Sequence, residues 1–320
     1  MNCAICPHFC ELEDGEIGKC KVITRSGEKI FNPRENEFSN ISVDSIEKRP
    51  FFHFLPGSKF LSCGWYGCNF LCKFCQNFTV SQQLGLSKTF TPEQLVELAL
   101  SRNVAGIAFT HNEPSLYYEY IHKVRQHISS IGSNLKIAVK TNGFVNPYVM
   151  QRLCEDADAI NIDIKGDNDD YKKICGGWIL PVLNSIDNAA ISEVHLEISY
   201  LVLPSKIENH EFNRQLQDFF ENLRSNIPLH LLYYFPFYKM QEESYDPLKL
   251  IKLQSFFSEV LRHVYISNCY HPEVIRCRNT YCDQCGKLLI DRESGVKIVE
   301  TECCNLSAYN ESWNLLIQTT

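Results

Sequence analysis

The sequence predicts an α/β protein whose parallel sheet curls into an open or closed barrel. Short apolar runs alternate with helical patterns from about residue 59 to residue 268, and runs such as AGIAF and AINIDI are apolar at nearly every position. Continuous apolar runs are typical of parallel strands covered on both faces. Strands separated by helices indicate βαβ units, and about six right-handed crossovers would curl the sheet.

Seven strands are expected along this region, in chain order Phe60–Cys63, Val104–Thr110, Lys136–Lys140, Ala157–Ile164, Val194–Leu203, Pro228–Phe235 and His263–Ser267. A helix should begin after Thr91, which can cap it, with Pro92 in the first turn and Gln94 completing a capping box. A second helix should begin at Asn146-Pro147, and Leu248–Leu261 has the period of an amphipathic helix. Ligands should lie at the carboxyl ends of the strands.

Cysteine usage divides the chain into three parts. Residues 1–55 form a cysteine-rich N-terminal extension, residues 56–270 the core barrel, and residues 271–320 a cysteine-rich C-terminal extension. The sixteen cysteines fall mostly in clusters. In a long chain without an export signal, clustered thiols are typical of metal binding rather than disulfides.

Composition limits the location and the partners. The formal net charge of -7, from 31 basic and 38 acidic residues, disfavours broad electrostatic binding of nucleic acid. We expect no membrane span, because no run of about 18 apolar residues occurs. The first 20 residues lack the apolar region of a signal peptide, so a cytoplasmic location is expected.

The strongest motif follows the first expected strand. GCNFLCKFCQN places Cys68, Cys72 and Cys75 on one loop. A 4Fe–4S cluster normally takes four thiolates, so three would leave one iron open to a ligand. The amino and carboxylate groups of a methionine could chelate that iron. The alternative interpretation is a zinc knot that uses Cys63 or a distant fourth ligand.

Several segments in a fixed order extend this pattern: CAICPHFCELEDGEIGKC, SIEKRPFFHFLPGS, the CQN loop, AFTHNEPS, TNG, AINIDIKG and IPLHLLYYFP. With CxxxCxxC after a first strand, the chain resembles the radical S-adenosylmethionine superfamily. Within it, the chain looks like the AmmeMemoRadiSam-system enzymes, relatives of the pyruvate formate-lyase activating enzymes. That resemblance implies a partial (β/α)6 TIM-like barrel that binds a 4Fe–4S cluster and S-adenosylmethionine.

The resemblance also implies roles for residues near the cluster motif. Phe74 would lie near the adenine, and Glu113, in Asn112–Pro114, would accept a hydrogen bond from the methionine ammonium. Capping of the next helix is the alternative role for Glu113. Thr141 and Asn142 are candidates for ligand contact, or ordinary turn residues.

Further candidates lie on the later strands. In NIDIKG, the period of two directs Asn161, Asp163 and Lys165 to one face, the barrel interior. By resemblance Lys165 would meet the methionine carboxylate with support from Asp163; an internal ion pair without a ligand is the alternative. Lys140 stands where related activating enzymes have aspartate, so a cation site there is not expected. His230 resembles the histidine that touches the nucleoside in those enzymes.

Each extension carries its own cysteine group. Four thiols close together suit a structural zinc ion or an auxiliary iron–sulfur cluster, and the spacing leaves both open; they are Cys3, Cys6, Cys10 and Cys20. The second group is Cys282 and Cys285 with Cys303 or the adjacent Cys304. Since adjacent residues converge poorly on one ion, Cys277 or His271 is an alternative ligand.

The expected activity is that of a radical enzyme. S-adenosylmethionine would be cleaved reductively to a 5′-deoxyadenosyl radical, which abstracts hydrogen from a small-molecule or peptide substrate. The resemblance implies a reducing electron donor such as flavodoxin or ferredoxin. Activation of a glycyl-radical enzyme is one alternative, and a noncatalytic iron–sulfur or zinc protein that binds a partner is another.

Overall fold

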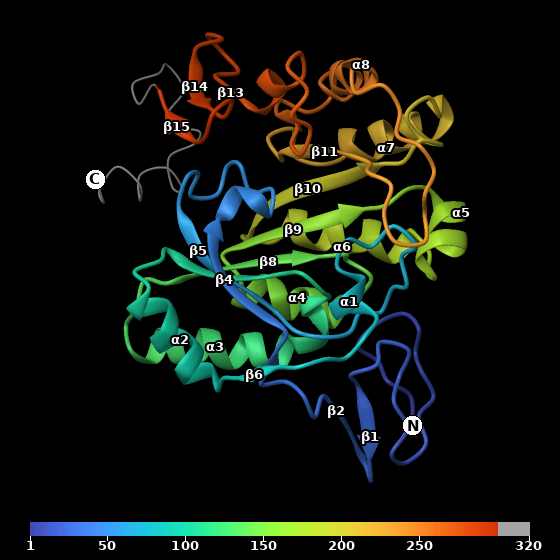
Figure 1. Cartoon of the computed structure of the whole chain (residues 1–320), viewed down its shortest axis with the longest axis vertical. Helices are drawn as coiled ribbons and strands as arrows, with labels where there is room; N and C mark the ends of the chain where they lie inside the picture. The colour runs from blue at the N-terminus through green and yellow to red at the C-terminus, as the bar shows by residue number, and fades with distance from the viewer. Residues whose placement is uncertain (300–320) are drawn as a thin grey trace.

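A computed structural model describes residues 1–299 of the chain. Its centre is an eight-stranded sheet in the order β12-β11-β10-β9-β8-β7-β5-β4 (Figure 1). The strands are β4 (Asn40–Ser45), β5 (Lys59–Gly64), β7 (Gly106–Phe109), β8 (Lys136–Thr141), β9 (Ala159–Ile164), β10 (His195–Val202), β11 (Leu229–Tyr233) and β12 (Val264–Ile266). The seven from β5 to β12 are parallel, and β4 pairs antiparallel with β5. The prediction of an α/β fold built on a parallel sheet is therefore confirmed.

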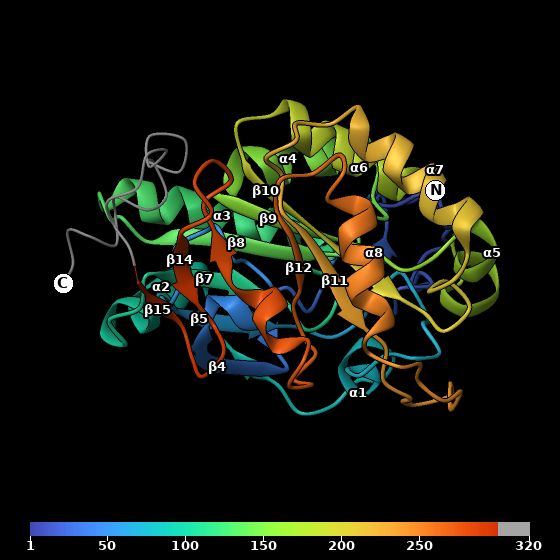
Figure 2. The same ribbon diagram turned by 90° about the horizontal axis from the view of Figure 1, so that it is seen from above.

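Helices follow most strands and cover the outer face of the curved sheet. They are α1 (Phe78–Ser81), α2 (Pro92–Ser101), α3 (Tyr118–Ser130), α4 (Pro147–Asp156), α5 (Asn168–Asp170), α6 (Leu180–Ile191), α7 (His210–Glu221) and α8 (Lys249–Phe257). The helices α2, α3, α4 and α6 contact one another in succession, and α6 and α8 pack on the last four strands (Figures 1 and 2). Their apolar faces and the strands form one continuous core.

Local sequence explains where two of these helices begin. The Thr91 hydroxyl accepts from the Gln94 backbone and the Gln94 side chain accepts from Thr91, so the predicted capping box is present at α2. Pro147 occupies the first turn of α4, as predicted. The last helix, α8, ends at Phe257, four residues earlier than its period indicates.

Smaller elements complete the two extensions and the connections. The strands are β1 (Thr24–Ser26), β2 (Lys29–Phe31), β3 (Glu37–Phe38), β6 (Lys88–Thr89), β13 (Thr280–Tyr281), β14 (Leu288–Asp291) and β15 (Lys297–Ile298). Single helical turns are η1 (Ile46–Lys48), η2 (Pro114–Tyr117), the π-helix η3 (Tyr171–Cys175) and η4 (Ile275–Arg278). Among residues 1–299, no helix has the length and apolar character needed to cross a bilayer.

The two edge strands, β4 and β12, do not pair with each other within residues 1–299, so the barrel is partial. A buried network closes its interior at the amino-terminal ends of the strands. Glu197 of β10 is fully buried and accepts from the backbone of Phe52 and His53, both at 2.9 Å. Arg292 of the C-terminal extension bonds Glu47 at 3.0 Å and the Phe52 carbonyl at 2.8 Å. These contacts join the C-terminal extension to the segment after β4.

Candidate active site

One cavity of about 920 Å³ opens inside the partial barrel. Its lining includes residues that follow three neighbouring strands: Thr110 after β7, Thr141 at the end of β8, and Lys165 after β9. Residues from both sheet edges complete the wall. Ligands of parallel α/β sheets bind at these carboxyl ends. The cavity therefore has the position and size expected of a small-molecule site.

Cys68, Cys72 and Cys75 all line this cavity, on the loop between β5 and α1. Backbone N–H groups two residues ahead point at two of the sulfurs: Phe70 N lies 3.4 Å from Cys68 Sγ, and Asn77 N donates to Cys75. Burial raises the pKa of the Cys68 thiol and of the Cys75 thiol. A bound metal would keep such thiols deprotonated, so the three suit metal coordination better than free-thiolate chemistry.

Cys63, the alternative zinc ligand, is directed away from this group. It is buried in β5, its thiol donates to the Leu61 carbonyl at 3.6 Å, and it lies close enough to Tyr120 of α3 to affect the pKa of that phenol. The described lining of the cavity does not include it. The structure therefore offers no support for a zinc knot that uses Cys63.

Two asparagines hold the cysteine loop in place. The Asn112 side chain donates to the carbonyls of Tyr66 and Gly67, both at 3.0 Å, and accepts from Trp65 N at 3.1 Å. Asn142 donates to Asn69 Oδ1 at 2.8 Å and lies 3.6 Å from Cys68 Sγ. Both residues, which the sequence predicted as ligand contacts, line the cavity. In this structure their side-chain amides form hydrogen bonds with the cysteine loop.

Glu113 is fully buried where the chain leaves β7. It caps η2 by accepting from Ser115 N at 3.0 Å, so the predicted capping role is present. It also accepts from Thr141 Oγ1 at 2.6 Å and Asn142 N at 2.8 Å. Burial raises the pKa of this carboxyl, against those hydrogen bonds. Glu113 is also part of the cavity lining.

Asp163 lies between two ammonium groups inside the cavity. Lys165 Nζ is 2.9 Å from Asp163 Oδ2, and Lys140 Nζ bonds the other carboxylate oxygen. Lys140 also donates to Ser199 at 2.8 Å. Burial alone would raise the pKa of Asp163, but Lys140 and Lys165 bring it below its usual value. Burial would lower the pKa of Lys165, yet Asp163 and Cys72 hold it well above its usual value.

The sequence placed Asp163 and Lys165 on one interior face, and the structure brings them together there. Lys140 joins them from β8 and pairs with the same carboxylate. Three titratable groups therefore share one positive charge beside the cysteine loop.

His230 of β11 is fully buried behind the cavity wall. One ring nitrogen lies 2.6 Å from Glu197 Oε2 and the other 2.6 Å from Ser267 Oγ. Neither nitrogen is open to a nucleoside in this structure, since both already have protein partners. Ser267, which the sequence did not single out, lines the cavity in its place.

Cys175 is a neighbour of the motif that sequence spacing could not reveal. It ends the π-helix η3, is fully buried, and its carbonyl accepts from Leu71 N at 2.8 Å. A hydrogen bond with the Cys175 thiol, and after it burial, raises the pKa of the Cys72 thiol well above its usual value. About a hundred residues separate the two in the chain. Phe74, also predicted, is buried in the cavity wall.

The four N-terminal cysteines lie close to one another and to the cysteine loop. Cys3, Cys6 and Cys20 are buried, and each sulfur accepts backbone N–H groups, from Ile5, His8, and Val22 with Ile23 respectively. Burial raises the pKa of Cys6 to about 12. Such N–H contacts favour thiolates. As they stand, no three His, Cys, Asp or Glu side chains in residues 1–299 converge into an ion-binding group.

The extension contacts the cysteine loop at Gly67. This residue has a φ of +79°, and a Cβ there would meet the Cys20 carbonyl oxygen at 2.5 Å. In the C-terminal extension, Cys282 N donates to Lys287 O at 2.9 Å and Gly286 N to Cys282 O at 3.0 Å, which forms a tight turn around Cys285. Cys303 and Cys304 lie outside the described residues.

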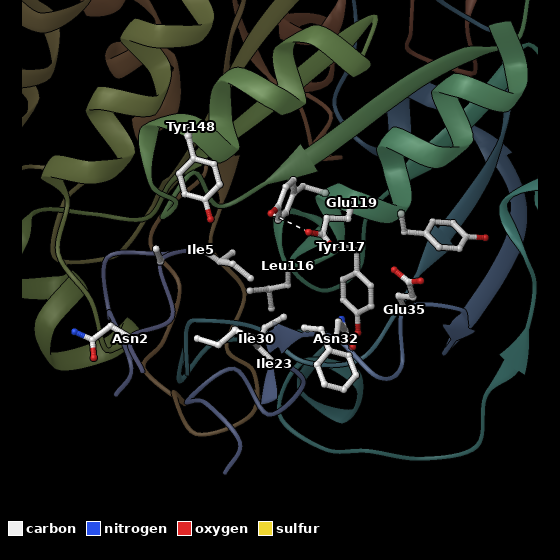
Figure 3. A pocket seen from close by; sticks show the side chains of 14 residues that line it. Asn2, Ile5, Ile23, Ile30, Asn32, Glu35, Leu116, Tyr117, Glu119 and Tyr148 are labelled. Carbon is white, nitrogen blue, oxygen red and sulfur yellow. Dashed lines mark hydrogen bonds between the residues drawn. The ribbon is translucent and has the colours of Figure 1, made fainter. Parts of the chain in front are cut away.

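A second cavity of about 150 Å³ marks where the N-terminal extension packs on the barrel (Figure 3). Leu116 and Tyr117 of η2 and Tyr148 of α4 face apolar residues of the extension, namely Ile5, Ile23 and Ile30. None of the cysteines is in its lining. We interpret it as a packing gap between the extension and the barrel.

Comparisons with known proteins agree with this architecture. The family model described as the radical SAM superfamily matches residues 64–210. An uncharacterised protein of Methanocaldococcus jannaschii is 33% identical over 96% of this chain and 93% of its own length. The pyruvate formate-lyase-activating enzyme of Clostridium pasteurianum is 24% identical over 61% of this chain and 88% of its own.

A solved structure shows the same fold. The radical SAM methyltransferase from Sphaerobacter thermophilus aligns with a TM-score of 0.51 at 13% identity, covering 73% of this chain and 71% of its own. The family match begins at the residue after Cys63 and includes the cysteine loop and the lysine–aspartate group. Together with the fold, these similarities establish that the chain belongs to the radical S-adenosylmethionine superfamily.

Proposed function

We propose that this protein is an enzyme that binds a 4Fe–4S cluster through Cys68, Cys72 and Cys75 and S-adenosylmethionine at the remaining iron. When bound, this pair supplies one-electron cleavage of the carbon–sulfur bond, giving methionine and a 5′-deoxyadenosyl radical that takes a hydrogen atom from the substrate. The observation that carries the proposal is that all three thiols line the same cavity as Glu113 and Lys165.

The chain's own residues would orient the methionine part of the cofactor. The Lys165 ammonium is held by Asp163 on one side and can donate to a carboxylate on the other, a charge-assisted bond. The Glu113 carboxylate, held by Ser115, Thr141 and Asn142, would face the ammonium. Asn142 and Asn112 keep the cysteine loop at the end of the cavity. Phe74 supplies an apolar wall suited to a planar base.

The test uses protein reconstituted with iron and sulfide without oxygen. Equilibrium binding of S-adenosylmethionine to wild type, Lys165→Ala and Lys173→Ala compares a cavity lysine with an exposed lysine that pairs with Asp169. We expect Lys165→Ala to weaken binding by about tenfold or more, as loss of a charge-assisted bond requires, and Lys173→Ala to leave it unchanged. Equal affinity in all three proteins would contradict the assignment and favour a noncatalytic role.

Activation of a protein partner is a second candidate. Its support is that several relatives are activating enzymes, among them the 4-hydroxyphenylacetate decarboxylase activating enzyme of Clostridioides difficile, 27% identical over 38% of this chain. A stable radical on an added glycyl-radical protein, detected by electron paramagnetic resonance, would favour this function. Conversion of a small molecule or peptide with no such protein radical would favour the first.

We also propose that Cys3, Cys6, Cys10 and Cys20 form a metal site, which holds either a zinc ion or an auxiliary iron–sulfur cluster. Burial and the N–H groups directed at three of the sulfurs support it. Metal analysis of wild type and Cys6→Ser tests it, with loss of one bound zinc or of one cluster expected in the variant. We propose in the same way that Cys282 and Cys285 bind a metal ion together with Cys303.

A reducing compartment such as the cytoplasm, and a small electron donor such as flavodoxin or ferredoxin, belong to the same proposal. The clustering of the cysteines, which is typical of metal binding by free thiols, supports a reducing environment.

A further inference from the structure

The wall of the large cavity carries more positive than negative charge, although the chain as a whole is acidic at -7. Its cationic side chains are Lys48, Arg49, Lys140, Lys165 and Arg278, and its carboxylates are Glu47, Glu113 and Asp163. The nearest outside partners, Asp44 and Arg292, add one charge of each sign. Low-dielectric walls concentrate such an excess, so the cavity attracts anions.

The cofactor proposed above would use only part of this charge. Lys165, with Lys140 and Asp163, would face the methionine carboxylate, and Glu113 the methionine ammonium. Arg49 and Arg278 are not needed for either contact. They lie on opposite edges of the open sheet, Arg49 just after η1 beside β4 and Arg278 at the end of η4 beyond β12, yet both line the same cavity.

Among residues 1–299, Arg278 forms no ion pair within 4 Å, although its charge acts to lower the pKa of the nearby Glu47 carboxyl, which is itself paired with Arg292. The Arg278 guanidinium lies 4.7 Å from the centre of the Tyr270 ring, and its Nε is buried without a hydrogen-bond acceptor.

Arg49 Nη2 lies 3.0 Å from Asp44 Oδ2, and Lys48 pairs with the other oxygen of the same carboxylate. The Nε of Arg49 is also buried without an acceptor. Because both arginines also line the cavity, the terminal N–H groups of their guanidinium groups can donate to an anion held between the two edges.

Aromatic rings line the same cavity. Tyr233 ends β11, and Tyr234 and Phe235 follow it. We propose that the substrate is a small anion whose carboxylate or phosphate is held by Arg278 and Arg49 and whose apolar body lies against these rings. This inference rests on the proposed function, because it assigns to the substrate the cavity wall that the cofactor leaves open.

The test measures binding of simple anions to the reconstituted enzyme by calorimetry. The probes are benzoate, inorganic phosphate, and benzamide as a neutral molecule of the same shape as benzoate. The variants are Arg278→Gln and Arg49→Gln, with Arg276→Gln as the matched control, since Arg276 is 77% exposed and pairs with Glu293. We expect benzoate or phosphate, but not benzamide, to bind wild type and the control.

Arg278→Gln should raise the dissociation constant of the preferred anion by about tenfold or more. Preference for benzoate identifies a carboxylate substrate, and preference for phosphate a phosphorylated one. Equal anion binding in Arg278→Gln and wild type, or benzamide binding as tight as benzoate, would overturn the inference. So would loss of S-adenosylmethionine binding in Arg278→Gln, because the arginine would then belong to the cofactor site. Anion binding without cofactor cleavage in wild type would overturn only the proposed function.

Discussion

Replacing Asp163 by asparagine tests the electrostatic account of the cavity. The change keeps the size of the side chain but removes the negative charge that Lys140 and Lys165 share. Both ammonium groups would then face only neutral acceptors inside the barrel. Their side chains are 14% and 15% exposed, so water compensates only in part.

The magnitude follows from this burial. Removing one partner of a buried ion pair costs about 3–5 kcal/mol. Because the cavity admits water, we expect a loss of roughly 2–3 kcal/mol in the free energy of unfolding and a fall in Tm of about 5 °C. The pKa of Asp163 is lowered on folding, so its contribution is present above its unfolded pKa and lost as the pH falls through the folded one.

The pKa of Lys165 is raised on folding. Its contribution to the free energy of unfolding is therefore complete at pH values below the pKa in the unfolded chain, and it is lost as the pH rises through the pKa in the folded protein. At pH 7 both contributions are complete, and urea unfolding at that pH is the assay. Asp169→Asn, which breaks an exposed pair with Lys173, is the control and should cost less than about 0.5 kcal/mol.

A double variant shows whether the loss of stability comes from the missing charge or from the amide group itself. Asp163→Asn combined with Lys140→Met leaves a single ammonium, so it should recover part of the lost stability. If Asp163→Asn is as stable as the control, or if the double variant is less stable than the single one, the electrostatic account is incorrect.

Two further predictions concern the frame of the site. Gly67→Ala should lower the free energy of unfolding by about 2 kcal/mol or more and make the N-terminal extension more sensitive to limited proteolysis, because the new Cβ would meet the Cys20 carbonyl. The control, Gly132→Ala, has a positive φ but open space around it and should lose only about 1 kcal/mol. Equal losses in the two variants would exclude the contact. Glu197→Gln should lose roughly 3–5 kcal/mol at pH 7. Since hydrogen bonds from His195 and His230 lower the pKa of Glu197 against burial, this difference should shrink as the pH falls through the folded pKa; a difference that stays constant to pH 3 would argue against an ionised Glu197.

The sequence located the parallel strands well because their apolar runs are continuous. All seven expected strands are present, with ends that differ by at most two residues. It missed β4, whose sequence NISVDS mixes polar and apolar residues, because an edge strand buries little surface. This strand lies within residues 1–55, which cysteine usage had assigned to the N-terminal extension.

The site was predictable where residues follow one another in a motif. Cys68, Cys72, Cys75 and the strand-end residues Glu113 and Lys165 share one cavity, as their positions indicated. Contacts across the barrel were not predictable, because they depend on how strands far apart in the chain face each other. Cys175 beside Cys72 and Arg278 opposite Arg49 belong to this class. His230 was placed on the correct strand, but its burial behind Ser267 needed the structure.

The most direct measurement is formation of 5′-deoxyadenosine by the reduced, reconstituted protein with S-adenosylmethionine. Wild type and Cys154→Ala, which changes a cysteine outside the cavity lining, should both produce it. Cys72→Ala should produce none, because it removes one of the three thiols that would hold the cluster. Production by Cys72→Ala at the wild-type rate would contradict the central claim.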